Sequence, residues 1–85
     1  MYISVPQYGE NGFAFVWDED FAINCSIENN CVRIEANKQG LISLARHLLE
    51  LAQDDVPQFT HFHLDEFNSL EDDSSELLFV RNDTI

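Results

Sequence analysis

The hydrophobic residues of one segment recur with the period of an α-helix. Apolar side chains fall three, four, seven and eleven positions after the first of them, in the set Leu41, Leu44, Ala45, Leu48 and Ala52. This spacing predicts a helix over about residues 38–53 that buries the leucine stripe, with Leu48 as its anchor in the core. Asn37 precedes the segment as the predicted N-cap, and Arg46 and Glu50 are expected to pair on the solvent side.

Before the helix, apolar and polar residues alternate, as in a half-buried strand. The turn signal Asn29-Asn30 follows, because asparagine tolerates the positive φ angles of a tight hairpin turn. A hairpin with this turn places Ile27 opposite Val32 and gathers one apolar face from Phe21, Ile23, Cys25, Ile27, Val32, Ile34 and Ala36. Cys25 and Cys31 then lie on opposite faces, so we expect two reduced thiols.

Short runs of strand-forming residues occupy the rest of the chain. They predict strands near residues 2–5 and 13–17 before the hairpin, and near 59–65 and 76–81 after the helix. The last run is apolar on both faces, which favours a covered strand. The sequence therefore predicts a single α+β domain over residues 1–85, in which a small antiparallel sheet of about five or six strands packs against one helix. The expected order is four strands, the helix and two strands.

The charge of the chain restricts its partners. Sixteen Asp and Glu against four Lys and Arg give a formal net charge of -12. Such a field repels phosphate backbones and anionic lipid, so we expect no nucleic-acid or membrane-surface binding, and it attracts basic proteins. The N-terminus lacks the basic and apolar regions of a signal peptide, and no apolar run could span a bilayer. We therefore expect a cytoplasmic protein.

Candidate chemistry concentrates on the strand after the helix. His61, His63 and Asp65 share one face of that strand, where two imidazoles and a carboxylate could chelate a divalent ion with help from Glu76. The alternative is an outward polar row with hydrogen bonds inside the sheet. No residue is placed in sequence to form a catalytic triad with His47, and no phosphate-binding loop or Cys-x-x-Cys motif occurs. We expect a protein that is not an enzyme and needs no cofactor.

The second half of the chain resembles a family of short bacterial immunity proteins, which are proposed to be encoded beside polymorphic toxins and to neutralise them by binding. The resemblance extends from Ala36 to Val80 and rests on the motifs Asn37-Lys38, Gly40-Leu41, Leu44-Ala45, His47-Leu48, Leu51-Ala52, Val56-Pro57, His61-x-His63-Leu64-Asp65 and Ser75-Glu76-Leu77. It implies an α+β fold and a toxin as protein partner. In related sequences a glycine is expected before the last motif, where Asp73 and Ser74 stand here.

The function predicted from the sequence is therefore the neutralisation of a toxin, for example a basic nuclease, by an acidic surface. The residues assigned to that surface are Asp54, Asp55, His61, His63, Asp65, Glu66, Glu71, Asp72 and Asp73. Two alternatives stay open. One is a small metal-binding protein or metal-dependent enzyme that uses His61, His63 and Asp65, and the other is a generic interaction module that forms a homodimer.

Overall fold

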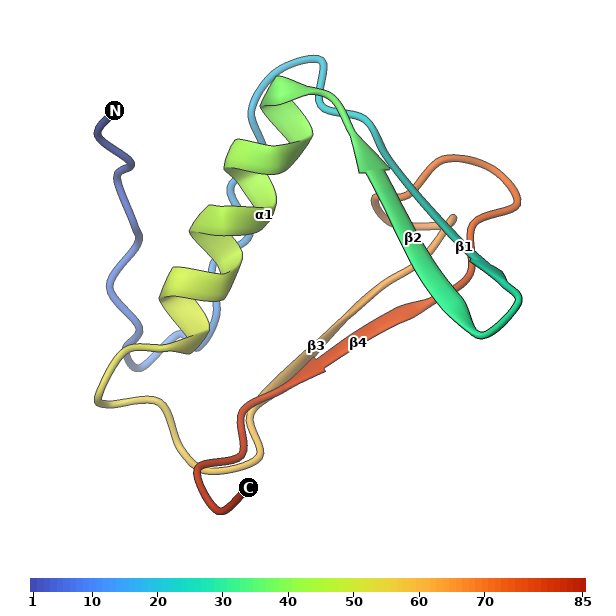
Figure 1. The fold of residues 1–85 in the computed structure, drawn as a ribbon. Helices are drawn as coiled ribbons and strands as arrows, with labels where there is room; N and C mark the ends of the chain where they lie inside the picture. Colours follow the sequence, from blue (N-terminus) through green and yellow to red (C-terminus); the bar gives the residue numbers. More distant parts are fainter.

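The structure, a computed structural model that describes residues 1–85, contains one helix and two small antiparallel sheets (Figure 1). The elements follow the order β1 (Ile23–Glu28), β2 (Cys31–Ala36), α1 (Lys38–Leu51), β3 (His61–Leu64) and β4 (Leu77–Val80). The α+β class is confirmed. The expected sheet of five or six strands is wrong, because β1 pairs only with β2 and β3 only with β4. No helix has the length and apolar character that a membrane crossing needs.

The β1–β2 hairpin has the predicted register. Ile27 is opposite Val32, and both turn residues, Asn29 and Asn30, have positive φ angles of 53° and 63°. Both cysteines are free, Cys25 buried and Cys31 exposed. The expected apolar face is only partly buried, because the far half of the hairpin projects beyond the body of the molecule (Figure 1). The apolar residues that remain exposed on this half are Ile27, Val32 and Ile34.

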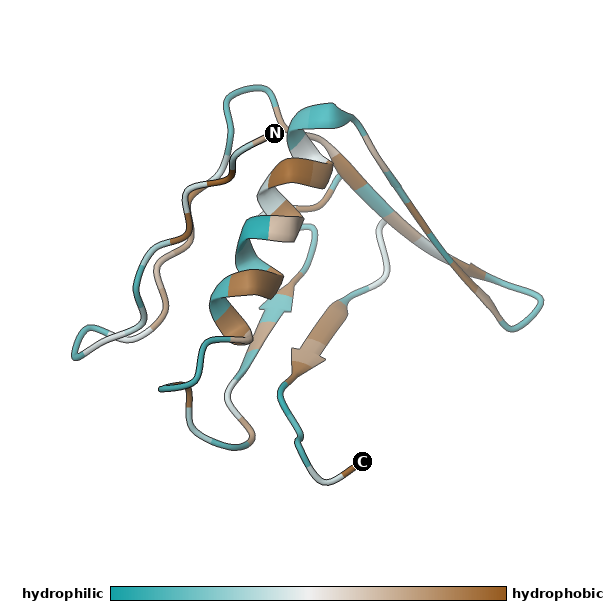
Figure 2. Cartoon of the chain, turned by 60° about the vertical axis from the view of Figure 1, so that its left-hand side comes forward, coloured by the Kyte–Doolittle hydropathy of each residue, from teal (hydrophilic) through white to brown (hydrophobic).

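Residues 1–18, here called the N-terminal ribbon, run down one side of α1 and back instead of forming strands (Figures 1 and 2). Side chains of the helix take the place of a partner strand. The backbone N–H groups of Tyr8, Ala14 and Asp18 donate to Gln53 Oε1, Glu50 Oε2 and Ser43 Oγ at 2.8, 2.7 and 2.8 Å. The strands predicted at 2–5 and 13–17 do not form. In the second segment the N–H of Ala14 finds its partner on the helix and does not need a sheet.

Arg46 joins the two arms of the N-terminal ribbon. Its guanidinium donates to the carbonyl of Ser4 at 3.0 Å on the outgoing arm and to that of Val16 at 3.1 Å on the returning arm. It also forms an ion pair of 2.9 Å with Asp18. The predicted solvent-side pair of Arg46 with Glu50 is therefore wrong. Arg46 holds the ribbon, and Glu50 is buried.

The helix begins at the predicted N-cap, because Asn37 Oδ1 accepts a hydrogen bond of 2.8 Å from Gly40 N–H. It is rotated relative to the prediction. Its buried face consists of Gly40, Ser43, Leu44, His47, Glu50 and Leu51. Leu41 and Leu48 are exposed, so Leu48 is not the core anchor. The rotation follows from the ribbon, whose backbone needs the polar side chains on the inner side of α1.

The hydrophobic core lies between α1, the inner face of β3 and the base of the hairpin. Its buried members are Ile23, Cys25, Leu44, Leu51, Val56, Phe62, Leu64 and Leu70. The loop between β3 and β4 closes one side of this core by binding the outer edge of β1. Glu71 N–H donates to the carbonyl of Ile23 at 2.9 Å, and Ser75 N–H donates to that of Cys25 at 2.8 Å. This edge of the hairpin is therefore covered.

Candidate functional site

The two histidines of β3 lie where the alternation predicted. Phe62 and Leu64 are buried, and His61 and His63 are exposed on the opposite face. Their ring centroids are 5.4 Å apart. His63 Nδ1 lies 3.3 Å from a carboxylate oxygen of Glu76, and His61 Nδ1 lies 3.1 Å from the carbonyl oxygen of Phe59. The outer face of β3 is thus a polar row with a neighbouring carboxylate, which agrees with the hydrogen-bonded alternative.

Asp65 does not join the histidine row. Its Oδ1 accepts hydrogen bonds from the backbone N–H groups of Phe67 at 2.9 Å and Asn68 at 3.1 Å. These bonds fix the turn at which the chain leaves β3. No group of three or more His, Cys, Asp or Glu side chains is arranged to hold a metal ion. The structure therefore does not bring His61, His63 and Asp65 together as a set of metal ligands.

Among the remaining acidic residues of the loop between β3 and β4, some stabilise the conformation of the loop and others are free on its surface. Glu66 Oε2 accepts a hydrogen bond of 2.9 Å from Asp73 N–H across the loop. Asp73 has a φ angle of 66°, in the left-handed region that favours glycine, and it stands in the region where the resemblance suggested one. Glu71, Asp72 and Asp73 remain exposed. The loop therefore presents acidic side chains from a backbone that is anchored to β1.

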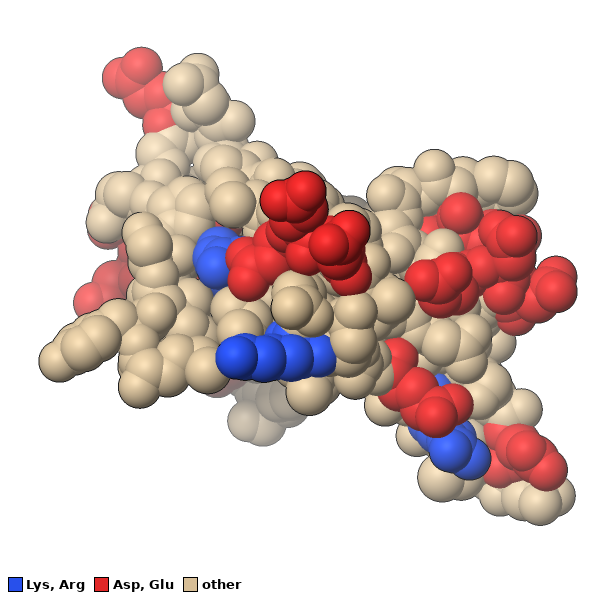
Figure 3. Space-filling model, turned by 90° about the horizontal axis from the view of Figure 1, so that it is seen from above, with Lys and Arg blue, Asp and Glu red and all other residues tan.

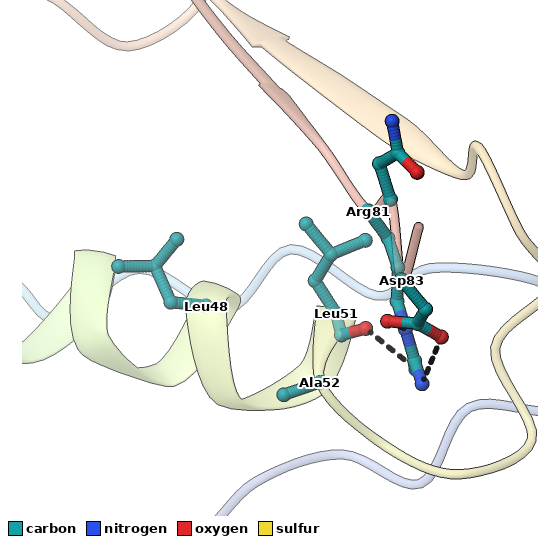
Figure 4. A pocket seen from close by; sticks show the side chains of 6 residues that line it. Leu48, Leu51, Ala52, Arg81 and Asp83 are labelled. Atoms are coloured by element: carbon teal, nitrogen blue, oxygen red, sulfur yellow. Dashed lines mark hydrogen bonds and ion pairs between the residues drawn. The ribbon is translucent and has the colours of Figure 1, made fainter. Parts of the chain in front are cut away.

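Asp54 and Asp55 lie elsewhere. They follow the lower end of α1 in Figure 1, whereas the loop between β3 and β4 lies toward the opposite end of the molecule. The nine residues assigned to one acidic surface thus occupy separate regions. The helix end beside Asp54 is bound by Arg81, which donates to the backbone carbonyl of Leu51 at 3.2 Å (Figure 4). It also donates to the carbonyl of Gln53.

Acidic side chains are prominent on the face of the molecule at which α1 begins (Figure 3). Figure 3 shows acidic side chains in separate groups, over the loop that precedes β1, over the loop between β3 and β4 and over the hairpin. A depression of about 260 Å³ lies among these elements, with Asn24, Glu35, Asn37 and Glu71 in its lining. Glu35 and Glu71 contribute carboxylates to this lining, which suit a cationic side chain.

The residues with the most altered acid–base properties are buried, and the sequence did not single them out as a site. His47 is surrounded by the rings of Phe13, Phe15, Trp17 and Phe62, with Trp17 nearest at a centroid distance of 4.3 Å. Burial lowers its pKa to about 4, an effect that the backbone of Val16 partly opposes and the charge of Arg46 reinforces. Neither ring nitrogen makes a hydrogen bond of ordinary geometry.

Glu50 lies one turn further along the same face. Its Oε2 accepts from Ala14, and its Oε1 has no partner. Burial raises the pKa of this carboxyl, and the hydrogen bond from Ala14 acts in the opposite direction. The pair His47 and Glu50 is closed off from solvent, so its role is to fix the ribbon and the aromatic cluster against the helix.

A comparison with protein-family models matches residues 32–82 to immunity protein 32. The chain belongs to this family. Comparisons with curated proteins and with solved structures gave no match. The family region takes in nearly all of β2 together with α1, β3 and β4. The N-terminal ribbon and β1 lie outside it, although the ribbon supplies the backbone groups that bind the polar face of α1.

Sequence reasoning missed one surface of this immunity protein. Of the leucines in the predicted buried stripe, Leu44 is buried, whereas Leu41 and Leu48 lie on the outside of α1, where Leu49 is exposed as well. A signal was present, because Ser43, His47 and Glu50 also recur at helical intervals and define a second stripe. The leucine-rich helix alone does not reveal which of the two stripes faces inward.

Proposed function

We propose that the protein binds a bacterial toxin and blocks its activity inside the cell that carries both. The observation that supports this function is the match of residues 32–82 to an immunity protein family. A family so described implies a toxin as its target, and α1, held by hydrogen bonds to the N-terminal ribbon and to Arg81, offers a preformed surface for it. We place the action in the cytoplasm, where a toxin made by the same cell would first appear.

We infer that the protein acts by binding and not by catalysis. A general acid or base must reach the substrate. His47 and Glu50, the groups with shifted pKa values, are enclosed in the core. The exposed histidines His61 and His63 lie on an open strand face, with Glu76 as the carboxylate partner of His63.

We further propose that the acidic surface speeds the encounter with a basic toxin, such as a nuclease. The net charge of -12 supports this, because opposite charges accelerate association and the effect fades with salt. The loop between β3 and β4 is the strongest contributor, since Glu71, Asp72 and Asp73 are exposed on an anchored backbone.

The decisive experiment is co-expression with the toxin encoded by the neighbouring open reading frame. Growth of cells that express this toxin should be restored by the immunity protein, and the two proteins should co-purify. Persistent killing together with absence of a complex, while the immunity protein is folded and abundant, contradicts the proposed function.

The electrostatic proposal needs a separate test with matched charges. The double variant Asp72→Lys/Asp73→Lys should lower the association rate about tenfold or more at low salt, with the loss shrinking at high salt. The variant Glu10→Lys/Glu28→Lys changes the net charge equally at two exposed positions outside this loop and serves as control. Equal losses for both variants would assign the effect to net charge and not to the loop.

A further inference from the structure

Polar and apolar residues are not divided between the faces of α1 as in an ordinary surface helix. The inner face carries Ser43, His47 and Glu50, all fully buried, beside the core residues Leu44 and Leu51. The outer face carries apolar residues over most of its length, namely Leu41, Ala45, Leu48 and Leu49, followed by the C-cap Ala52. Figure 2 shows hydrophobic residues in successive turns of the helix. An isolated exposed leucine needs no explanation, but a contiguous apolar surface is a common mark of an interaction site.

The exposed fractions of the leucines are large. Leu41 is 56 % exposed, Leu48 is 40 % exposed and Leu49 is 50 % exposed. Because Leu41 and Leu48 are two turns apart, with Ala45 between them, they form a ridge with a shallow middle along the helix axis. This is the spacing at which a facing helix or an apolar loop engages a helical surface.

A hollow lies at each end of this outer face. Near the start of α1, Met1 and Ile3 of the N-terminal ribbon join Leu41, Ile42 and Ala45 around a mostly apolar hollow of about 330 Å³. Near its end, Leu48, Ala52 and the residues around Arg81 surround a second hollow of about 290 Å³ (Figure 4). Such hollows can accept protruding side chains of a partner, which is how anchor residues are commonly buried in protein interfaces.

We propose that the outer face of α1 is the surface on which the toxin docks, through an apolar ridge or helix of the toxin that is flanked by Lys or Arg. This inference rests on the proposed function and assigns its interface. The charges at the end of the face support a basic flank, because Asp54 and Asp55 are exposed shortly after the C-cap Ala52. The one cation there, Arg81, is paired with Asp83 at 3.2 Å. A second copy of the chain is a less favourable occupant, because two chains that each carry a net charge of -12 repel each other.

The hairpin offers a competing apolar surface, with Ile27 62 % exposed and Val32 57 % exposed. That surface is confined to the projecting end of a two-stranded sheet, and the opposite face carries the ion pair of Arg33 with Glu35. No apolar hollow adjoins it, and the depression near its tip is lined mainly by polar residues, with Cys31 as the apolar one. Ile27 therefore provides a matched control, because it is apolar and exposed and lies near the hairpin turn, which projects away from α1 (Figure 1).

The test compares Leu48→Asp and Leu49→Asp with Ile27→Asp, using the toxin of the neighbouring open reading frame as the probe. Each variant is first checked for wild-type circular dichroism and a thermal midpoint near that of the wild type. Both helix variants should weaken binding to the toxin about 30-fold or more, as expected for truncated anchor residues, and fail to protect growth. Ile27→Asp should bind within about threefold of wild type, as expected for a residue outside the interface.

The possible outcomes separate the two proposals. If the wild-type protein does not bind the toxin, the proposed function fails. If the wild type binds, both helix variants bind equally well and Ile27→Asp does not, the docking surface is the hairpin and the present inference is overturned. Loss of a dimer in sedimentation experiments on Leu48→Asp, with toxin binding unchanged, would assign the face to a second copy and also overturn it.

Discussion

The carboxylate oxygen Oε2 of Glu50 accepts a hydrogen bond of 2.7 Å from the backbone N–H of Ala14, which lies 36 positions earlier in the chain. This contact fastens the returning arm of the N-terminal ribbon to the inner face of α1. It also places a carboxylate in the core, where Oε1 of the same group has no partner. Burial of a carboxylate is costly and favours the protonated form of Glu50, whereas the hydrogen bond from Ala14 favours the charged form and offsets part of that cost.

The first prediction concerns Glu50→Gln. The pKa of Glu50 is raised in the folded state, so its contribution to stability is present at low pH and is lost as the pH rises through the folded-state pKa. The variant keeps an oxygen for Ala14 N–H and has no charge to bury. It should therefore gain stability relative to the wild type as the pH rises from about 4 to 8, measured by urea unfolding. A difference that is the same at every pH would contradict this prediction.

His47 has the opposite pH dependence. Its pKa falls from 6.5 to about 4 in the folded state, so the unfolded chain binds the proton more tightly. The stabilisation from the neutral ring is complete above pH 6.5 and is lost as the pH falls toward about 4, by at most about 3 kcal/mol. In a His47→Phe variant, which preserves the aromatic cluster, unfolding free energies should fall less steeply between these pH values. Equal slopes for variant and wild type would show that the imidazole does not titrate on unfolding.

Local sequence signals predicted the parts of the fold that depend on neighbouring residues. The hairpin register followed from the Asn29-Asn30 turn and from alternation, and the N-cap at Asn37 followed from its position between a strand and a helix. The exposed face of His61 and His63 was also predicted correctly. These features need only the geometry of a strand or of a helix end.

The orientation of α1 could not be obtained in this way. It depends on hydrogen bonds to Tyr8, Ala14 and Asp18, which lie 45, 36 and 25 positions from their partners. Those bonds favour the burial of Ser43 and Glu50 over that of Leu41 and Leu48. The periodicity of a sequence registers only hydrophobicity and does not include such bonds. For the same reason the candidate surface was sought among acidic residues, because the exposed leucines had been assigned to the core.

The rotation of the helix predicts a clear difference between two leucines on it. Leu51 is 7 % exposed and contributes to the core, whereas Leu48 lies outside it. Leu51→Ala should lower the free energy of unfolding by about 2 to 4 kcal/mol, because it leaves a cavity. Leu48→Ala should cost less than about 1 kcal/mol, since much of its side chain already contacts water. Thermal unfolding of both variants measures the difference. If Leu48→Ala lost more stability than Leu51→Ala, the predicted leucine stripe would face the core after all.

Gly40 predicts a steric limit at the junction of helix and hairpin. A Cβ atom at this position would lie 2.5 Å from the carbonyl oxygen of Ala22 and 2.9 Å from Ile23 Cγ1. Gly40→Ala should therefore destabilise the protein by about 1 to 3 kcal/mol, although alanine favours helices by about 1 kcal/mol over glycine. Gly9→Ala, where a Cβ meets nothing within 4 Å, is the control and should leave the thermal midpoint nearly unchanged. A stabilised Gly40→Ala variant would show that helix and hairpin are not in close contact.

The last prediction concerns Arg81, which follows β4 and donates to the carbonyls of Leu51 and Gln53 at the end of α1. Its positive charge lies at the negative end of the helix dipole, and it offsets the unfavourable aspartates Asp54 and Asp55 that follow. Arg81→Gln should lower stability by about 1 to 3 kcal/mol, because partly buried carbonyls lose a charged donor. For a chain of this size that corresponds to a fall in thermal midpoint of about 4 °C or more.

Arg33→Gln removes the same charge at a surface site and provides the control. Arg33 pairs only with Glu35, at 3.2 Å, and both side chains are well exposed, so the cost should stay within about 0.5 kcal/mol. The comparison shows whether Arg81 stabilises the protein through its specific contacts or only through its contribution to the net charge. If the two variants lose equal stability, or if added salt abolishes the loss in Arg81→Gln, the arginine acts through net charge. If Arg81→Gln alone is destabilised and salt has little effect, the guanidinium holds the end of α1 against the strand, which keeps the outer face of the helix in place.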